Sequence, residues 1–307
     1  MIQSPYIKQA KLLIRLLPFL SGETDFALKG GTAINFFVRN LPRISVDIDI
    51  AYLLINKRDI ALNAISLMLQ RYYSYAQKIY PNSKITKKVM SDGKYLKGLI
   101  ISTKNATIKI EPNFVIRGCV FPTQKLSLSP QAKLTLEEDV DAQILSNADL
   151  YAGKICAALD RQHPRDLFDI LYLLKNEGLT YSVRKAFLVY LLSHPRPILE
   201  LLNPRRLEIS QSYMNEFIGM TSDEISLDQL IKTRDDLITK INSVLTKDEK
   251  RFIISFKNNQ PKWELLEIEH AKDFPAIRWK LHNLAKMPKQ KHKIALDKLS
   301  THLEIDY

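Results

Sequence analysis

The sequence contains little cysteine and no long apolar run. Of its 307 residues only Cys119 and Cys156 are cysteines, and neither lies in a CxxC or Cys/His spacing. That usage excludes a disulfide framework and a zinc knuckle, and it is typical of a reducing cytosol. No apolar run approaches the roughly 18 residues of a membrane span, and the N-terminus has no basic segment leading into an apolar core. We therefore expect a cytoplasmic protein without a signal peptide.

Acidic residues are scarce relative to basic ones. Lys and Arg outnumber Asp and Glu by 45 to 33, which gives a net charge of +12. The excess favours a polyanionic partner, with nucleic acid ahead of an anionic membrane surface, although a merely basic surface is also common. The hydrophobic fraction of 46% is that of an ordinary globular protein, and the length allows two domains.

The stretch 29–50 carries the first candidate site, which ends in two aspartates. Asp47 and Asp49 alternate with the apolar residues Val46, Ile48 and Ile50. A strand sends alternate side chains to opposite faces, so both carboxylates are expected to point one way. Two adjacent carboxylates repel each other, and a fold keeps such a pair readily when a cation lies between them. Oxygen ligands of this kind suit Mg²⁺ or Mn²⁺ rather than zinc.

The glycine pair upstream indicates a phosphate-holding turn. Gly30 and Gly31 allow positive φ and close approach of the backbone to a ligand. Thr32 then fits the N-cap of a helix over 33–39, whose first N–H groups attract phosphate. The alternative is a hairpin turn followed by a strand with two solvated acids.

A second strand offers a third carboxylate. In the sequence TIKIEPN, Ile108 and Ile110 alternate with Lys109 and Glu111, so Glu111 could reach the same metal from a neighbouring strand. It would be a third ligand, or the base that deprotonates an attacking hydroxyl. The alternative is an edge-strand glutamate closed off by Pro112. The order Lys-x-Glu, the reverse of Glu-x-Lys, counts against a nuclease.

The stretch 147–174 contains a second charged cluster. Lys154 and Arg161 lie seven residues apart on one expected helix face, and Pro164 starts a second helix. Asp166, in the first turn of that helix, could hold either cation, and Lys154 could bind a triphosphate as a point charge. The alternative is a surface pair, and we expect His163 to be a turn residue.

A basic tail follows near the C-terminus. Residues 278–293 contain six Lys or Arg and no acid, with Trp279 among them. Such a run can follow a phosphate backbone while the indole stacks on a base, although a solvated basic face is equally common. By contrast, 223–249 is expected to be a mixed-charge surface helix without chemistry.

The order of patterns predicts an α+β fold with a domain boundary near 145. A core over 1–145 is expected to contain a mixed β-sheet, and 146–307 a helical C-terminal domain with the basic tail. The stretch 122–141 is interpreted as a connection with room for one strand. Helices are expected at 5–20 and 61–79, and strands at 26–28, 84–90, 94–103, 107–111 and 114–121, with a hairpin turn at Asp92-Gly93.

Gly30-Gly31-Thr32 followed by Arg43-x-Ser45-x-Asp47-x-Asp49 resembles the AbiEii/AbiGii toxin family, within the DNA polymerase β-like nucleotidyltransferase superfamily. The resemblance covers roughly residues 25–175. It implies the polymerase β-like fold, the toxin half of a bacterial toxin–antitoxin or abortive-infection pair, and a possible cognate antitoxin. Some relatives modify the acceptor end of transfer RNA. The resemblance also implies functional roles for Lys154 and Asp166, whereas Glu111 departs from the aspartate that relatives often have.

We therefore predict a metal-dependent nucleotidyltransferase that releases pyrophosphate from a nucleoside triphosphate, acts on an acceptor hydroxyl such as the 3′ end of tRNA, and has no membrane partner. A catalytically silent nucleotide- or RNA-binding module is one alternative. A nucleotide-sugar glycosyltransferase is another, but it gives no reason for the glycine turn. The expected metal ligands are Asp47, Asp49 and Glu111; the other expected catalytic residues are Lys154 and Asp166; and the expected nucleotide-binding residues are Gly30, Gly31, Thr32, Arg43, Ser45 and Lys154.

Overall fold

The computed structural model describes residues 2–306, which divide into two compact units. The first unit runs to Leu150 and also contains Met214–Glu224, and the second comprises Tyr151–Tyr213 and the chain from Ile225 onward. The return of Met214–Glu224 to the first unit was not anticipated by the boundary expected near 145. Within that unit Thr221 forms a β-bridge with Arg43, so the returning segment borders the loop that precedes the Asp-x-Asp strand.

The first unit is built on a mixed seven-stranded sheet, as the sequence predicts. Its strand order is β3-β4-β5-β2-β1-β7-β6. The pairs β2–β5 and β1–β7 are parallel, and the other pairs are antiparallel. The strands are β1 (Phe26–Lys29), β2 (Asp47–Tyr52), β3 (Lys84–Val89), β4 (Leu96–Ser102), β5 (Thr107–Pro112), β6 (Gln124–Ser127) and β7 (Asp141–Ile144).

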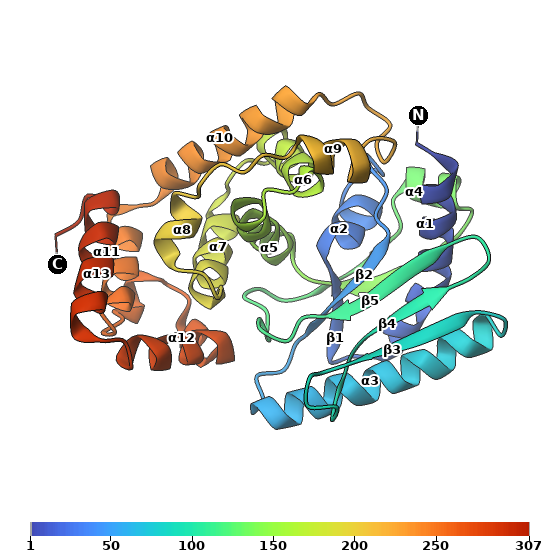
Figure 1. Cartoon of the computed structure of the whole chain (residues 1–307), viewed down its shortest axis with the longest axis horizontal. Coiled ribbons are helices and arrows are strands. Elements are labelled where there is room, and N and C mark those ends of the chain that lie inside the picture. Colours follow the sequence, from blue (N-terminus) through green and yellow to red (C-terminus); the bar gives the residue numbers. More distant parts are fainter. Residues whose placement is uncertain (1, 307) are drawn as a thin grey trace. The chain divides into compact units, whose positions relative to one another are not determined.

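Two long helices pack against this sheet. Helix α1 (Ser4–Leu16) contacts β5, and α3 (Arg58–Ile79) contacts β4 and runs along β3 and β4 in Figure 1. Ile48 and Ile50 of β2 are fully buried, which is the outcome expected for the apolar half of an alternating strand. The remaining helical segments of this unit are η1 (Leu17–Gly22), α2 (Gly30–Ala33), the π-helical η2 (Ile34–Val38) and α4 (Pro130–Leu136).

The strand expected at 114–121 is wrong, because this stretch is a loop held by side chains. The carboxylate of Asp149 accepts hydrogen bonds from the backbone N–H groups of Val120 and Phe121 at 2.8 and 3.0 Å. The side chain of Asn113 accepts two further backbone N–H groups from the same loop. Side-chain acceptors therefore bind backbone N–H groups that would otherwise bond to a neighbouring strand. The loop can for this reason satisfy its backbone without pairing in the β-sheet.

The stretch 122–141 is more structured than the sequence suggested. It contains β6, and then α4, in which Pro130 occupies the first turn. Pro at this position is favourable because its missing N–H would have no helical partner there. The predicted hairpin is confirmed, with Gly93 at φ +69° in the turn between β3 and β4.

The second unit is helical, and its described residues contain no strand. Helix α5 begins in the first unit and continues into the second, whereas α9 begins in the second unit and ends in the first. Helices α10 and α11 both begin with capping boxes, at Ser226 and Thr246. The helices are α5 (Asn147–Asp160), α6 (Pro164–Lys175), α7 (Tyr181–Ser193), α8 (Ile198–Leu202), α9 (Ser210–Glu216), α10 (Leu227–Val244), α11 (Lys247–Lys257), α12 (Pro275–Ala285) and α13 (Lys289–Leu303), with short 3₁₀ turns η3 (Trp263–Leu265) and η4 (Glu269–Asp273).

The expectation of a single surface helix at 223–249 is wrong. The stretch contains α10 and the start of α11, and α10 packs against α6 with Leu230, Leu237 and Ile241 buried. The sequence had suggested a charged surface because Asp and Lys fill the outer positions of an amphipathic helix.

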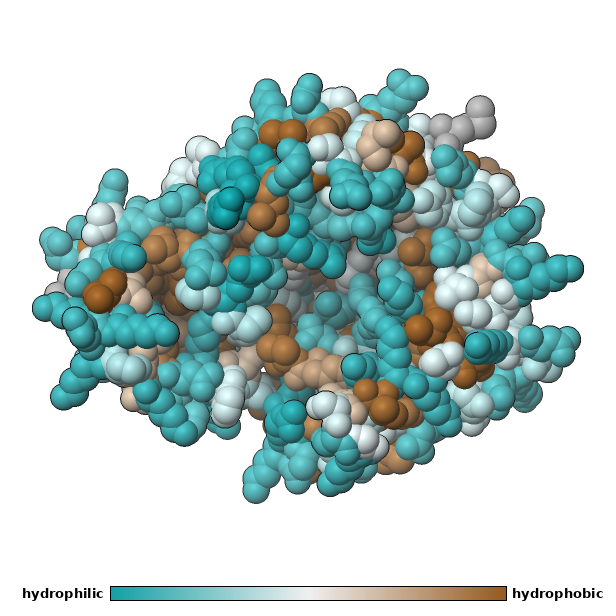
Figure 2. Space-filling view, viewed as in Figure 1, coloured by the Kyte–Doolittle hydropathy of each residue, from teal (hydrophilic) through white to brown (hydrophobic). Residues whose placement is uncertain are grey.

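The outer surface is mostly hydrophilic on the face that Figure 2 shows, with hydrophobic groups confined to small separate patches. None of the helices in residues 2–306 is both long and apolar enough to cross a membrane.

Candidate active site

The site is built around the polar face of β2. Asp47 and Asp49 are partly exposed, whereas Ile48 and Ile50 between them are fully buried. The two carboxylates therefore rise from one face of the sheet, as the alternating sequence predicts.

Strand β5 brings Glu111 to the same face. In the parallel pairing of β2 and β5, Asp47 is the Cα partner of Lys109, and Asp49 is the Cα partner of Glu111. Residues in register on adjacent strands project to the same side, so Glu111 stands beside Asp49 and Lys109 beside Asp47.

On its other side Asp49 has a lysine neighbour, which the sequence alone does not indicate. Lys29, the last residue of β1, is the antiparallel Cα partner of Asp49. Asp49 therefore lies between a cation on β1 and Glu111 on β5. The only signal for Lys29 was its position directly before the glycine pair.

At Gly30 the backbone of the glycine turn lies against the carboxylate of Asp49. Its φ is +72°, and a Cβ built on Gly30 would lie 2.2 Å from Oδ2 of Asp49. Both the backbone conformation and the close approach of the carboxylate therefore require glycine here.

Gly31 is needed for a different reason from the one expected. Positive φ was predicted at both glycines, but that prediction is correct only for Gly30. A Cβ on Gly31 would lie 2.6 Å from Nη2 of Arg43 and 3.0 Å from Oγ of Ser45. Arg43 is 2% exposed, and its guanidinium donates a hydrogen bond to the Ile44 carbonyl at 2.9 Å. The fold thus gathers Arg43 and Ser45 against the glycine turn.

Thr32 is not the N-cap that the sequence suggested. Helix α2 begins at Gly30 with Lys29 in the N-cap position, so Thr32 lies inside the helix and is fully buried. Its hydroxyl donates a hydrogen bond to the backbone carbonyl of Asp47 at 2.6 Å. Thr32 therefore fastens the glycine turn to the Asp-x-Asp strand.

Glu111 pairs with a lysine on the edge strand. Nζ of Lys88 lies 3.4 Å from its carboxylate, and 45% of the Glu111 side chain is exposed. On β4, a Cβ added to Gly98 would lie 4.0 Å from Cγ of Glu111. Gly98 therefore presents no side chain to Glu111 on the β4 side, and the ion pair of Glu111 with Lys88 is long and partly exposed.

The three carboxylates do not form a closed metal cluster. Across residues 2–306 no group of three His, Cys, Asp or Glu side chains is close enough to hold an ion. Asp47 and Asp49 nevertheless provide oxygen donors on one face, and Glu111 is in register beside Asp49 on the adjacent strand. This donor set fits a hard divalent cation that keeps part of its water shell.

In the second unit, Lys154 is the centre of a buried ion cluster. Its ammonium lies 2.8 Å from a carboxylate oxygen of Asp166 and 3.0 Å from one of Asp169. Arg161, in the turn directly after α5, donates to Asp166 through Nε at 2.5 Å and Nη2 at 3.0 Å. Asp166 thus contacts both cations. The surface-pair alternative is wrong, because Asp166 is fully buried and Lys154 is 7% exposed.

The charge of Asp166 depends on these partners. Burial opposes ionisation, but the charge of Lys154 and the hydrogen bonds from Arg161 outweigh it and hold the pKa of Asp166 well below its usual range. Asp169 was missed as a functional candidate, although its position one turn after Asp166 was a visible signal. His163 is the N-cap of α6, accepting a hydrogen bond from the Arg165 N–H, and so is a turn residue as expected.

Several cations of the basic tail are already engaged. Arg278 pairs with Asp273 at 2.6 Å, and Nζ of Lys280 donates to two backbone carbonyls. Trp279 is 65% exposed and stacks on His282 with 5.5 Å between ring centroids. The cations that remain exposed lie mainly on and before α13: Lys286, Lys289, Lys291 and Lys293.

Comparison with known proteins identifies the family. A sequence profile described as "Nucleotidyl transferase AbiEii toxin, Type IV TA system" matches residues 11–283. No curated protein sequence matches the chain. Among solved structures, MenT4, a nucleotidyltransferase toxin from Mycobacterium tuberculosis H37Rv, is similar over 97% of this chain and 95% of that chain, with 15% identity and a TM-score of 0.57. This likeness confirms the expected fold. Because the profile spans most of the sequence, the chain belongs to the AbiEii family of nucleotidyltransferase toxins of type IV toxin–antitoxin systems.

Proposed function

We propose that the chain transfers a nucleotidyl group from a nucleoside triphosphate to an RNA hydroxyl, and that the transfer requires Mg²⁺ or Mn²⁺. Family membership implies the triphosphate substrate and a cognate antitoxin. The observation that supports the divalent ion and the transfer reaction is the environment of Asp49. Its carboxylate lies against Gly30 of the glycine turn, and Asp49 is in register with Glu111. The turn that we propose to hold phosphate and the carboxylate that we propose as a further metal ligand are therefore both adjacent to Asp49.

Asp47 and Asp49 are the proposed ligands of the divalent ion, with Glu111 as a third ligand or as the base. Their carboxylate oxygens match the preference of Mg²⁺ and Mn²⁺ for oxygen donors. When bound, the ion supplies neutralisation of the triphosphate oxygens and of the leaving pyrophosphate.

The triphosphate is held by the glycine turn in this proposal. The partly exposed Gly30, where α2 begins, is the proposed contact with the phosphates, buried Gly31 lets Arg43 and Ser45 approach the turn, and Lys29 adds a cation beside Asp49. The guanidinium of Arg43 donates a hydrogen bond to the Ile44 carbonyl and lies against Gly31, so we assign Arg43, together with Ser45, the role of supporting the turn.

Lys154 and Asp166 are the functional residues that we propose in the second unit. Lys154 is the proposed phosphate-binding cation, and Asp166 positions it through their 2.8 Å contact. Asp169 shares that role at 3.0 Å.

The chemical step is a displacement at the α-phosphorus. The acceptor oxygen forms a bond to this phosphorus while the bond to the oxygen bridging the β-phosphorus breaks, and pyrophosphate leaves. The hydroxyl proton passes to the carboxylate of Glu111. A positioned base of this kind contributes about 10² to 10⁴ in rate.

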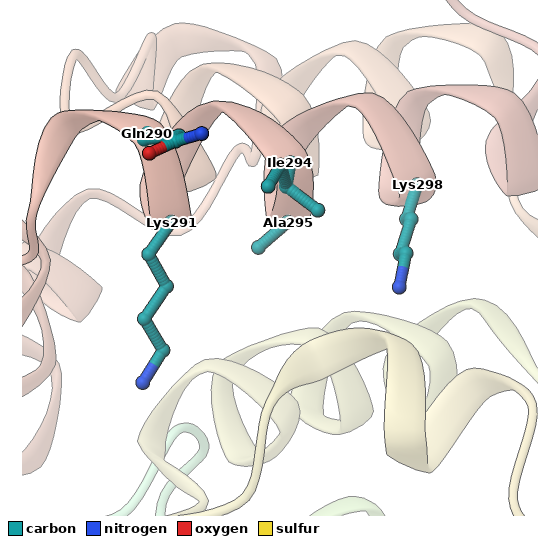
Figure 3. A pocket seen from close by; sticks show the side chains of 5 residues that line it. All are labelled: Gln290, Lys291, Ile294, Ala295 and Lys298. Atoms are coloured by element: carbon teal, nitrogen blue, oxygen red, sulfur yellow. The ribbon is translucent and has the colours of Figure 1, made fainter.

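RNA is the acceptor that the charge favours, and the 3′ end of tRNA is the specific candidate. One face of α13 borders a hollow of about 330 Å³ with two lysines beside an apolar floor. Figure 3 shows Lys291 and Lys298 projecting from the same side of this helix, with Ile294 and Ala295 between them. Such a surface can follow a phosphate backbone.

The test is incubation with triphosphates labelled at the α-phosphate, together with Mg²⁺ and total RNA. We expect label in RNA, released pyrophosphate, and loss of both products when the divalent ion is chelated. Label in protein or in a small molecule would overturn the RNA acceptor. RNA binding without any transfer would instead favour the binding-module alternative.

A further inference from the structure

The second unit contains a small pocket that shares no residue with the proposed transfer site. It has a volume of about 170 Å³ and is bordered by the loop before α8, the end of α11 and one side of α12. Pro197 and Ile198 form part of its apolar wall. Its polar lining consists of Lys257, Lys280 and Asn283.

Two lysines line this pocket without a carboxylate partner. Nζ of Lys280 donates hydrogen bonds to the carbonyls of His194 and Arg196, each at 2.5 Å, which leaves one of its three donors. The ammonium of Lys257 has no hydrogen-bond or ion-pair partner within residues 2–306, and its backbone carbonyl contacts His292.

The two cations destabilise each other. Burial and then the charge of Lys257 lower the pKa of Lys280 to about 8, and burial also lowers the pKa of Lys257. The charge of Glu200 raises the pKa of Lys280, but by less than burial and Lys257 lower it. Two like charges beside apolar walls repel strongly, and an anion between them would relieve the repulsion and use the remaining N–H donors.

Helix α12, which borders the pocket, also carries an exposed aromatic ring. Lys280, Asn283 and Met287 line the pocket at helical spacing, and Trp279 lies four residues before Asn283, so the two share a side of the helix. The indole of Trp279 is 65% exposed and stacks on His282. A cationic pocket next to an exposed ring is the combination that holds a phosphate and its base.

We propose that this pocket binds the phosphate of a nucleotide whose base stacks on Trp279. The nucleotide is either free or a unit of an RNA strand. This inference does not rest on the proposed function, because it uses none of the residues assigned to the transfer reaction.

The test is a titration with adenosine 5′-monophosphate, without added divalent ion, followed by tryptophan fluorescence. The difference between the wild type and Trp279→Phe isolates Trp279, since the other tryptophan, Trp263, packs against Phe252 and Phe256. We expect saturable quenching that is lost in Trp279→Phe and reversed by inorganic phosphate.

Lys257→Gln should weaken this binding about tenfold, the effect of one charge-assisted hydrogen bond. It spares Lys280, whose ammonium holds the loop carbonyls. Lys247→Gln is the matched control, since it removes the same charge from the exposed far end of α11 and should leave affinity unchanged. Asp49→Asn should also bind normally, which separates the pocket from the transfer site.

A second arm uses a short oligoadenylate. If Lys257→Gln weakens only oligonucleotide binding, while Lys247→Gln does not, the nucleotide belongs to an RNA strand and the proposal stands. If neither ligand changes Trp279 fluorescence, or if both lysine variants behave alike, the proposal is wrong.

Discussion

Asp49 and Glu111 are Cα partners on the adjacent parallel strands β2 and β5, so their side chains rise from the same face of the sheet. This register gives Glu111 access to the Asp-x-Asp pair, although it now pairs with Lys88 at 3.4 Å. A long ion pair with a 45% exposed glutamate contributes little to stability. The cost of moving Glu111 towards a metal or a hydroxyl is therefore small.

Glu111→Gln should lower turnover without unfolding the protein. The substitution keeps size and shape but removes the charge, so the loss of a base should reduce kcat by about 10² to 10⁴. Glu111→Asp restores the charge on a shorter side chain and should retain more activity than Glu111→Gln. Single-turnover rates of the three proteins provide the measurement. Wild-type turnover in Glu111→Gln would remove Glu111 from the mechanism.

Gly30→Ala should abolish activity at a modest cost in stability. The added Cβ would lie 2.2 Å from Oδ2 of Asp49 and must displace that carboxylate. Gly93→Ala is the control, because Gly93 has φ +69° and no described atom within 4 Å of an added Cβ. The backbone strain should cost each variant about 1 to 2 kcal/mol in the free energy of unfolding. Equal activity in the two variants would contradict the proposed role of Gly30.

Asp166→Asn should destabilise the second unit strongly. Removing one partner from a buried ion cluster typically lowers the free energy of unfolding by about 3 to 5 kcal/mol. Asp273→Asn is a suitable control, because its pair with Arg278 is exposed and should contribute about 0 to 1 kcal/mol. Denaturant unfolding at neutral pH would compare the two variants. Similar stability losses would mean that the cluster is not a stabilising element.

The stability contributed by the Asp166 charge should also depend on pH in a defined direction. The folded pKa is lower than the unfolded value of about 3.9, so the contribution is complete above that pH and is lost as pH falls through the folded pKa. The difference in stability between wild type and Asp166→Asn should therefore be constant from neutral pH to about pH 5 and shrink below about pH 4. A difference that already shrinks near pH 6 would exclude this assignment.

Converting Lys286, Lys289, Lys291 and Lys293 to Gln should flatten the salt dependence of RNA binding. All four side chains are exposed, and each phosphate contact with single-stranded RNA contributes a slope of about −0.7 in log K against log salt. Filter binding at several salt concentrations would measure that slope. An unchanged affinity and slope would mean that this surface is only solvated.

Local patterns in the sequence were enough to predict strands β1 to β5 and helices α1 and α3, although they also suggested a strand at 114–121, where the structure has a loop. The alternation around Asp47 and Asp49 specified the polar face of β2, because side-chain direction in a strand depends only on neighbouring residues. The turn at Asp92-Gly93 was predictable for the same reason. These signals require no knowledge of which strands pair.

Long-range pairing explains what the sequence did not reveal. Nothing local to Lys29 shows that β1 and β2 align it with Asp49, and nothing in Met214–Glu224 signals its return to the first unit. The residue type of Thr32 predicts an N-cap. The structure instead starts α2 at Gly30 and directs the Thr32 hydroxyl to the Asp47 carbonyl.

Asp169 illustrates the same limit in the second unit. Its spacing from Asp166 was compatible with a solvated first turn of α6, and only the packing of α5 against α6 turns both carboxylates towards Lys154. Charge patterns along one helix do not distinguish these outcomes.

The most direct test of the central claim is label transfer by Asp49→Asn. This substitution keeps the shape of the side chain that contacts Gly30, so the fold should be preserved. It removes a charged metal ligand, so binding of the divalent ion and of the triphosphate should be lost. With matched circular dichroism spectra, wild-type protein should transfer the α-labelled nucleotidyl group to RNA in Mg²⁺, and Asp49→Asn should transfer none above background. Transfer at the wild-type rate by a correctly folded Asp49→Asn protein would contradict the proposed site.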